Sequence, residues 1–164
     1  MRISEGVEWA AHCVNVLAAL PEGMALSAAT LAEFHGVPKP YLAKSLQALS
    51  RAGLVTSSAG RSGGYRLSRP AERITLLDVV LAVEGSQPAF RCTEIRQRSP
   101  QPPPKSCLRS SCQIAAAMWE AEAAWRSSLA AITMADIARG VSESIPEATL
   151  AANATWLAER VGRA

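Results

Sequence analysis

The sequence predicts a mainly α-helical protein that carries one small β-hairpin. Apolar residues recur at helical spacing along much of the 164-residue chain, and glycine and proline signals cut its first half into short segments. Two stretches of alternating character flank a glycine-rich turn, which is typical of a hairpin. Hydrophobic residues make up 49% of the chain, which is enough for a buried core.

The first half begins with three predicted helices. They cover residues 4–20, 28–35 and about 39–52. Ser27 is a suitable N-cap for the second helix, and Gly36 and Gly53 stop the second and the third. The second and third helices are short and are joined by the tight turn HGVPKP, so the pair is typical of a helix-turn-helix.

Two short strands follow these helices directly. They are LVTSS and YRLSR, and AGRSGG between them supplies glycines for a tight connection. A helix-turn-helix followed by such a hairpin forms a winged helix, in which the third helix enters the major groove of DNA and the wing lies along phosphates or the minor groove. The sequence therefore predicts a winged helix-turn-helix domain.

The second half of the chain is expected to hold two subunits together as a dimer, so that two DNA-binding domains are joined. A helix is predicted over 75–83. The segment that follows, 86–111, holds five of the ten prolines, and a loop of this length in a compact domain usually has a function. A long helix over 112–139 would reach roughly 40 Å, and its apolar stripe favours a homodimer with recognition helices about 34–36 Å apart. A last amphipathic helix is predicted over 146–161. The expected parts are 1–85 for DNA binding, 86–111 for the loop and 112–164 for dimerisation.

Charge is unevenly distributed along the chain. Residues 36–70 hold six Lys and Arg and no acid, so this window is +6 and the rest of the chain is −3, for an overall +3. We therefore predict a double-stranded DNA operator as partner. No run approaches the roughly 20 apolar residues that cross a bilayer, and the N-terminus lacks the pattern of a secretion signal. We expect a cytoplasmic protein with no membrane partner. Since hydrolytic and nucleotide-binding motifs are missing, we expect no enzymatic activity.

The DNA contacts are predicted on the third helix and the wing. If Leu42, Leu46 and Leu49 face the core, the opposite face can donate to phosphates or base edges. That face carries Lys39, Tyr41, Lys44, Ser45, Gln47 and Arg51. On the wing the candidates are Arg61, Ser62, Gly63, Gly64 and Tyr65. The wing glycines would allow close approach to the DNA backbone or to a narrow minor groove.

The segment EWAAHC combines a carboxylate, an indole, an imidazole and a thiol within the first helix. Glu8 and His12 are four apart and share one helix face, but the spacing alone does not decide whether that face packs, hydrates or binds a ligand. Cys13 lies among apolar residues and is expected to pack as a small hydrophobe. Three further thiols lie in or beside the loop: Cys92, Cys107 and Cys112. In a cytosolic protein such thiols more often bind metal or react than form structural disulfides.

These segments together resemble a known family. EWAAHC, VPKPYLAKSLQALSRAGLV, GRSGGYRLSRP and ITLLDVVLAVEG, followed by a cysteine-bearing loop, are similar to the winged-helix iron–sulfur regulators that include IscR and NsrR. VEWAAHC and FRCTEIRQR most resemble the RsrR-type redox sensors of that family, which hold a two-iron two-sulfur (2Fe-2S) cluster. The chain departs from the common pattern of three closely spaced cysteines, and Ala115 stands where IscR-like proteins have a histidine.

The resemblance implies a particular ligand set for a 2Fe-2S cofactor. Glu8 and His12 would come from one subunit and Cys107 and Cys112 from the other, while Cys92 is left out. It also implies that Trp9 swings between buried and exposed positions on redox change. The expected function is a dimeric transcriptional regulator, acting as a repressor, that senses redox state through this cluster.

Other readings of the same residues stay open. The Glu8/His12 pair could simply be solvated, Trp9 could be core, and Cys92 could replace one of the helix ligands. The loop cysteines could instead bind zinc or form a regulatory disulfide, which would make the protein a cluster-free regulator. An electron-transfer iron–sulfur protein is less favoured, because it would bind DNA weakly and the basic window, residues 36–70, indicates DNA binding.

Overall fold

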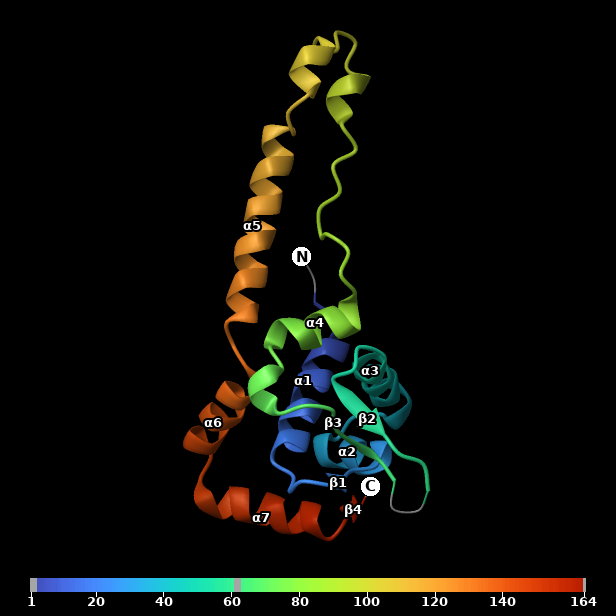
Figure 1. The fold of residues 1–164 in the computed structure, drawn as a ribbon, viewed down its shortest axis with the longest axis vertical. Helices are drawn as coiled ribbons and strands as arrows, with labels where there is room; N and C mark the ends of the chain where they lie inside the picture. The colour runs from blue at the N-terminus through green and yellow to red at the C-terminus, as the bar shows by residue number, and fades with distance from the viewer. Residues whose placement is uncertain (1–2, 61–62, 164) are drawn as a thin grey trace.

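Figure 1 shows a body of short helices from which a long arm projects. The computed structural model describes residues 3–60 and 63–163. In chain order the elements are α1 (Glu5–Ala18), β1 (Met24–Ala25), α2 (Ala28–His35), α3 (Lys39–Arg51), β2 (Val55–Ser57), β3 (Tyr65–Leu67), η1 (Ala71–Arg73), α4 (Leu76–Glu84), η2 (Ile95–Arg98), η3 (Lys105–Leu108), α5 (Gln113–Ala130), α6 (Met134–Ser144), α7 (Glu147–Ala158) and β4 (Gly162–Arg163). The predicted class, mainly helical with a small hairpin, is confirmed.

The core of the body forms where α1, α2 and α3 meet. Val14, Leu31, Leu42 and Leu46 are fully buried there, and burying each such side chain stabilises the fold by about 1.5–3 kcal/mol. The predicted start of α2 is confirmed, because the Ser27 hydroxyl accepts a hydrogen bond from the Thr30 amide at 3.0 Å. Packing and capping together hold α2 and α3 as a helix-turn-helix.

The wing is a two-stranded antiparallel sheet. β2 pairs with β3 in the register Val55↔Leu67, Thr56↔Arg66 and Ser57↔Tyr65. Its base is anchored to the body, because Tyr65 and Leu26 exchange backbone hydrogen bonds of 2.8 and 3.0 Å. The predicted hairpin is confirmed, and its anchorage orients the wing relative to α3.

The predicted single helix over 112–139 is wrong. The chain breaks after Ala130, and the Thr133 side chain caps a new helix, α6, in a reciprocal capping box with Asp136. The intervening backbone crosses the start of α4, where the Leu76 amide donates to the Ile132 carbonyl at 2.8 Å. With 18 residues α5 spans about 27 Å rather than the expected length.

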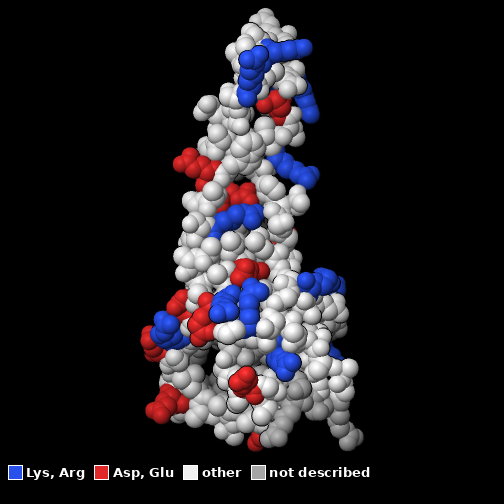
Figure 2. Space-filling model, viewed as in Figure 1, with Lys and Arg blue, Asp and Glu red and all other residues white. Residues whose placement is uncertain are grey.

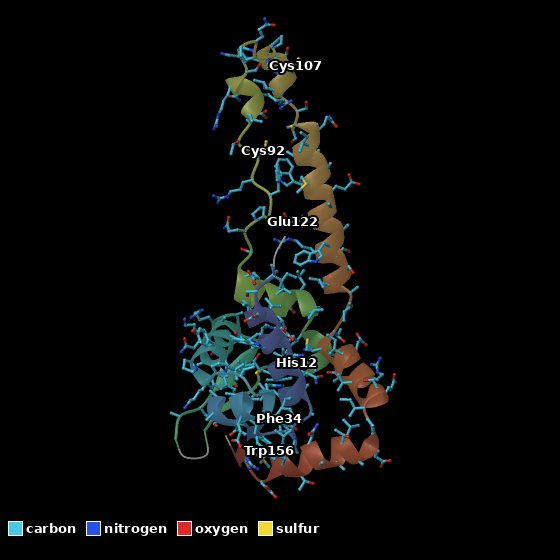
Figure 3. The ribbon with its side chains drawn as sticks, turned by 180° about the vertical axis from the view of Figure 1, so that it is seen from behind. His12, Phe34, Cys92, Cys107, Glu122 and Trp156 are labelled. Carbon is cyan, nitrogen blue, oxygen red and sulfur yellow. The ribbon has the colours of Figure 1, made fainter. Side chains whose placement is uncertain are left out.

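The arm consists of α5 and the loop 86–111, which lie side by side in Figures 1 and 3. Three side chains of α5 hold the first part of the loop. Glu122 accepts from the Ala89 amide at 3.0 Å, Trp119 donates from its ring nitrogen to the Phe90 carbonyl at 3.4 Å, and Arg126 donates to the Ser86 and Gln87 carbonyls. The loop therefore extends away from the body along α5.

The end of the chain returns to the body, as Figure 1 shows. The predicted last helix is confirmed as α7, in which Leu157 is buried and the Trp156 ring lies 5.5 Å from the ring of Phe34 on α2. β4 then pairs with β1. Within the described ranges, no helix is both long enough and apolar enough to cross a membrane.

Candidate functional site

The exposed face of α3 carries five of the eleven predicted DNA contacts. Lys39, Tyr41, Lys44, Gln47 and Arg51 are all exposed. The Lys44 ammonium lies 5.6 Å from the centre of the Tyr41 ring, so the two side chains form one basic and aromatic surface. These groups can donate to phosphates and base edges in the major groove.

Ser45 does not belong to that face, and its predicted outward position is wrong. It is 5% exposed, and its hydroxyl donates to the Gly6 carbonyl of α1 at 3.1 Å. Ser45 lies three residues after Leu42 and four before Leu49, so helical periodicity places it on the core side. Its hydroxyl joins α3 to α1 and is not available to DNA.

The wing residues divide in a similar way. Arg61 and Ser62 lie outside the described residues. A Cβ on Gly63 would lie 2.3 Å from the Ser58 carbonyl oxygen, and one on Gly64 would lie 2.5 Å from the Leu26 carbonyl oxygen. These glycines are therefore required by the chain's own backbone contacts. Tyr65 is half-buried against the core.

Glu8, Trp9 and His12 lie on α1, and Trp9 and His12 have neighbours on the helix-turn-helix. Glu8 and His12 are exposed, while Trp9 is half-buried with its ring edge-on to Tyr41 at 6.4 Å. The His12 ring lies 5.6 Å from that of His35, a neighbour from α2 that sequence reasoning missed because 23 positions separate the two. Burial, and then the nearby His12, lower the pKa of His35. The His35 Nε2 atom is buried with no hydrogen-bond partner in the part of the chain that is described.

The four cysteines lie in two different environments. Cys13 is fully buried in the body, as expected, and burial raises its pKa to about 12. Cys92 and Cys112 are half-buried and Cys107 is exposed on the arm. Figure 3 shows Cys92 and Cys107 on the outer part of the arm, whereas His12 lies in the body.

One chain alone does not bring the predicted ligands together. Among residues 3–60 and 63–163, no three His, Cys, Asp or Glu side chains are close enough to hold a metal ion. Ala115, at the position of the IscR-like histidine, is buried and adds no donor. Two thiolates, one imidazole and one carboxylate nevertheless form a donor set that suits iron in a 2Fe-2S cluster.

Sequence reasoning also missed a polar contact inside the cysteine loop. The guanidinium of Arg96 binds the carboxylate of Glu94 and the carbonyl of Ser110. The only local signal was a basic side chain close to Cys92 in FRCTEIRQR. The contact with Ser110 depends on how the loop folds back on itself.

The helix-turn-helix, the anchored wing and the basic face of α3 define a winged-helix DNA-binding protein with an appended arm. The sequence matches the Rrf2 family, described as iron-dependent transcriptional regulators, over residues 3–140. The chain therefore belongs to the Rrf2 family, whose members are DNA-binding transcriptional regulators and not enzymes.

Solved structures with this fold include other regulators. CymR, the global cysteine regulator of B. subtilis, superposes with a TM-score of 0.66 at 22% identity, over 85% of this chain and 97% of that one. T. potens IscR superposes with a TM-score of 0.65, also at 22% identity, over 90% and 93%. Protein aau3 of Rhizobium meliloti (strain 1021) is 40% identical over 94 residues, which span 57% of this chain and 60% of that protein.

Proposed function

We propose that this regulator is a homodimeric repressor whose affinity for a roughly palindromic operator depends on a 2Fe-2S cluster at the dimer interface. Glu8 and His12 of one subunit and Cys107 and Cys112 of the other hold the cluster. In this arrangement 1–85 binds DNA, 86–111 carries the cysteines and 112–164 pairs the subunits.

The observation that carries this proposal is the separation of the two ligand pairs. Cys107 lies towards the far end of the arm and His12 in the body of the same chain (Figure 3). Polar contacts from α5 hold the loop away from the body. A site that uses both pairs is therefore assembled between two chains.

Two surface properties support a dimer built in this way. Ile114, Met118 and Trp119 on α5 are 69%, 45% and 41% exposed, and contact with a second α5 would remove this apolar surface from water. Residues 86–111 contain five basic side chains and one acidic one, and Figure 2 shows Lys and Arg gathered at the far end of the arm. The first turn of α1, in contrast, holds Glu5 and Glu8. The charges therefore favour docking of the loop on α1 of a partner.

The surroundings of His12 also suit an interface. The His35 Nε2 atom beside it is buried and lacks a partner among the described residues. Buried polar atoms are usually satisfied, and those that are not call for a missing component. A docked loop from a second subunit would supply one.

The path from the site to DNA runs through α1. Glu8 and His12 would hold one side of the cluster, which would supply one-electron redox chemistry when bound, and a change of one charge there would be felt by both side chains. Trp9, next to Glu8, touches Tyr41 on the recognition helix. A shift of Trp9 therefore changes the surface that α3 presents to the operator.

A cluster-free regulator switched by zinc or thiol oxidation is the second candidate. It is favoured by one observation, that Arg96 bonds Glu94 and Ser110 and so draws the segments beside Cys92 and Cys112 together. An electron-transfer protein is disfavoured, because it would not need a basic recognition helix. Iron and sulfide analysis separates these candidates.

The test counts iron and acid-labile sulfide in anaerobically purified dimers. A mixed dimer is made from two variants. One subunit carries Glu8→Ala with His12→Ala, and the other carries Cys107→Ser with Cys112→Ser. Both mutant homodimers should lack the cluster. The mixed dimer should recover half of the wild-type iron, because one of its two sites still receives all four native ligands. Cys13→Ala serves as the control and should keep full iron.

Two results would contradict the proposal. A mixed dimer with no iron would mean that each chain supplies a complete ligand set by itself. Wild-type protein that stays colourless after anaerobic reconstitution, with neither iron nor sulfide, would leave the zinc- or thiol-switched regulator.

A further inference from the structure

The cysteine-bearing loop, residues 86–111, contains a cluster of hydrogen bonds centred on Arg96. Its guanidinium binds both carboxylate oxygens of Glu94, at 2.5 Å from Nε and 2.8 Å from the terminal nitrogen. Glu94 has a φ of +50°, and it is the one non-glycine residue with positive φ in the described parts of the chain. Such backbone strain persists where surrounding contacts hold it, and it is common at functional sites.

The same guanidinium reaches across the loop. It donates to the carbonyl of Ser110 at 3.2 Å, fourteen positions further along the chain. Glu94 lies two residues after Cys92, and Ser110 lies two residues before Cys112. Arg96 therefore links the segment just after Cys92 to the segment just before Cys112.

The two thiols also interact with the charge of Arg96. The pKa of Arg96 is raised, first by its hydrogen bond to Glu94 and further by the charges of Cys112 and Cys92. Because Arg96 bonds Glu94 and Ser110, each two positions from a cysteine, its guanidinium is held near both Cys92 and Cys112. In contrast, Arg98 in the same 3-10 helix is exposed, and its side chain makes no hydrogen bond or ion pair within 3–60 and 63–163.

We propose that Arg96 is a positioning residue of the loop 86–111. It ties the segment after Cys92 to the segment before Cys112, and it holds a fixed positive charge beside both cysteines. The tie is a property of the chain itself, whereas the effect on a cluster rests on the proposed function. A positive charge near a cluster favours the more negative, reduced state, so Arg96 raises the reduction potential.

The tie is tested without any cluster, by amide hydrogen exchange of the metal-free protein. Arg96→Gln should make amides between residues 94 and 112 exchange about tenfold faster, as expected for the loss of charge-assisted bonds. Arg98→Gln removes the same charge from the same helix and should leave their exchange unchanged. Equal exchange in the two variants would overturn the tie.

The charge is tested by the midpoint potential of the reconstituted protein. Arg96→Gln should lower the potential relative to Arg98→Gln. Arg96→Lys, which keeps the charge but loses the forked geometry, should retain the wild-type potential while its loop exchanges faster. Equal potentials in Arg96→Gln and Arg98→Gln would overturn the role of the charge. If the wild type bound no cluster, the proposed function would fail, but the exchange comparison would still decide the tie.

Discussion

Replacing Gly64 with alanine should destabilise the protein even in the absence of DNA. The added Cβ would lie 2.5 Å from the carbonyl oxygen and 2.6 Å from the carbonyl carbon of Leu26, and 3.0 Å from the Ser27 nitrogen. All three atoms belong to backbone, so the contact cannot be relieved by turning a side chain. The base of the wing must therefore move away from the body.

The cost follows from what this movement disturbs. Leu26 and Tyr65 exchange hydrogen bonds of 2.8 and 3.0 Å beside Gly64, and weakening both costs about 1 kcal/mol each. Overpacking adds about 1–3 kcal/mol. The free energy of unfolding should thus fall by about 3–5 kcal/mol.

Gly140→Ala is the matched control. Gly140 lies within α6, and a Cβ there would have no neighbour within 4 Å. The same substitution should stabilise the protein by about 0.5–1 kcal/mol through helix propensity. Urea unfolding of both variants and the wild type, at equal protein concentration because dimerisation contributes to stability, measures the difference.

The reasoning would be refuted if Gly64→Ala unfolded within about 1 kcal/mol of the wild type. In that case Gly64 would serve only the approach to DNA, as the sequence predicted for the wing glycines. Operator affinity would then fall without any loss of stability.

Two further predictions concern α3 and the buried thiol. Ser45→Ala should lower the free energy of unfolding by about 1 kcal/mol, because it removes the bond to the Gly6 carbonyl. Gln47→Ala, on the exposed face, should leave the free energy of unfolding unchanged and weaken operator binding by about 1–3 kcal/mol. Urea unfolding and operator titration of each variant check this. The opposite pattern would reverse our assignment of the two faces of α3. In the folded metal-free protein at pH 8, iodoacetamide should label Cys107 but not Cys13, since burial raises the Cys13 pKa to about 12. Mass spectrometry before and after unfolding checks this, and rapid native labelling of Cys13 would contradict it.

Local signals were sufficient for much of the fold. The cap at Ser27, the glycine after α2 and the alternating strands with their glycine-rich turn each act within a few residues, so they predicted the helix-turn-helix and the wing. The break before α6 also had a local signal, the Thr133/Asp136 capping box, which the continuous apolar stripe obscured. The basic window likewise predicted DNA as partner, because charge is readable from composition.

The candidate site could be predicted only as a set of residue types. Glu8 and His12 share a helix face by their spacing alone, and the loop thiols were identified by their position. The neighbour His35 and the buried hydroxyl of Ser45 were not predictable in this way. Both depend on where α1, α2 and α3 cross.

By itself the sequence determined the helix-turn-helix, the wing, the basic window and the positions of the loop thiols, because caps, periodicity and charge are local properties of the chain. Only the tertiary structure decided that α5 holds the loop away from the body, that Ser45 joins α3 to α1 and that Arg96 closes the loop. These contacts join residues far apart in sequence. Their geometry is set by the packing of whole elements, which no short stretch of residues encodes.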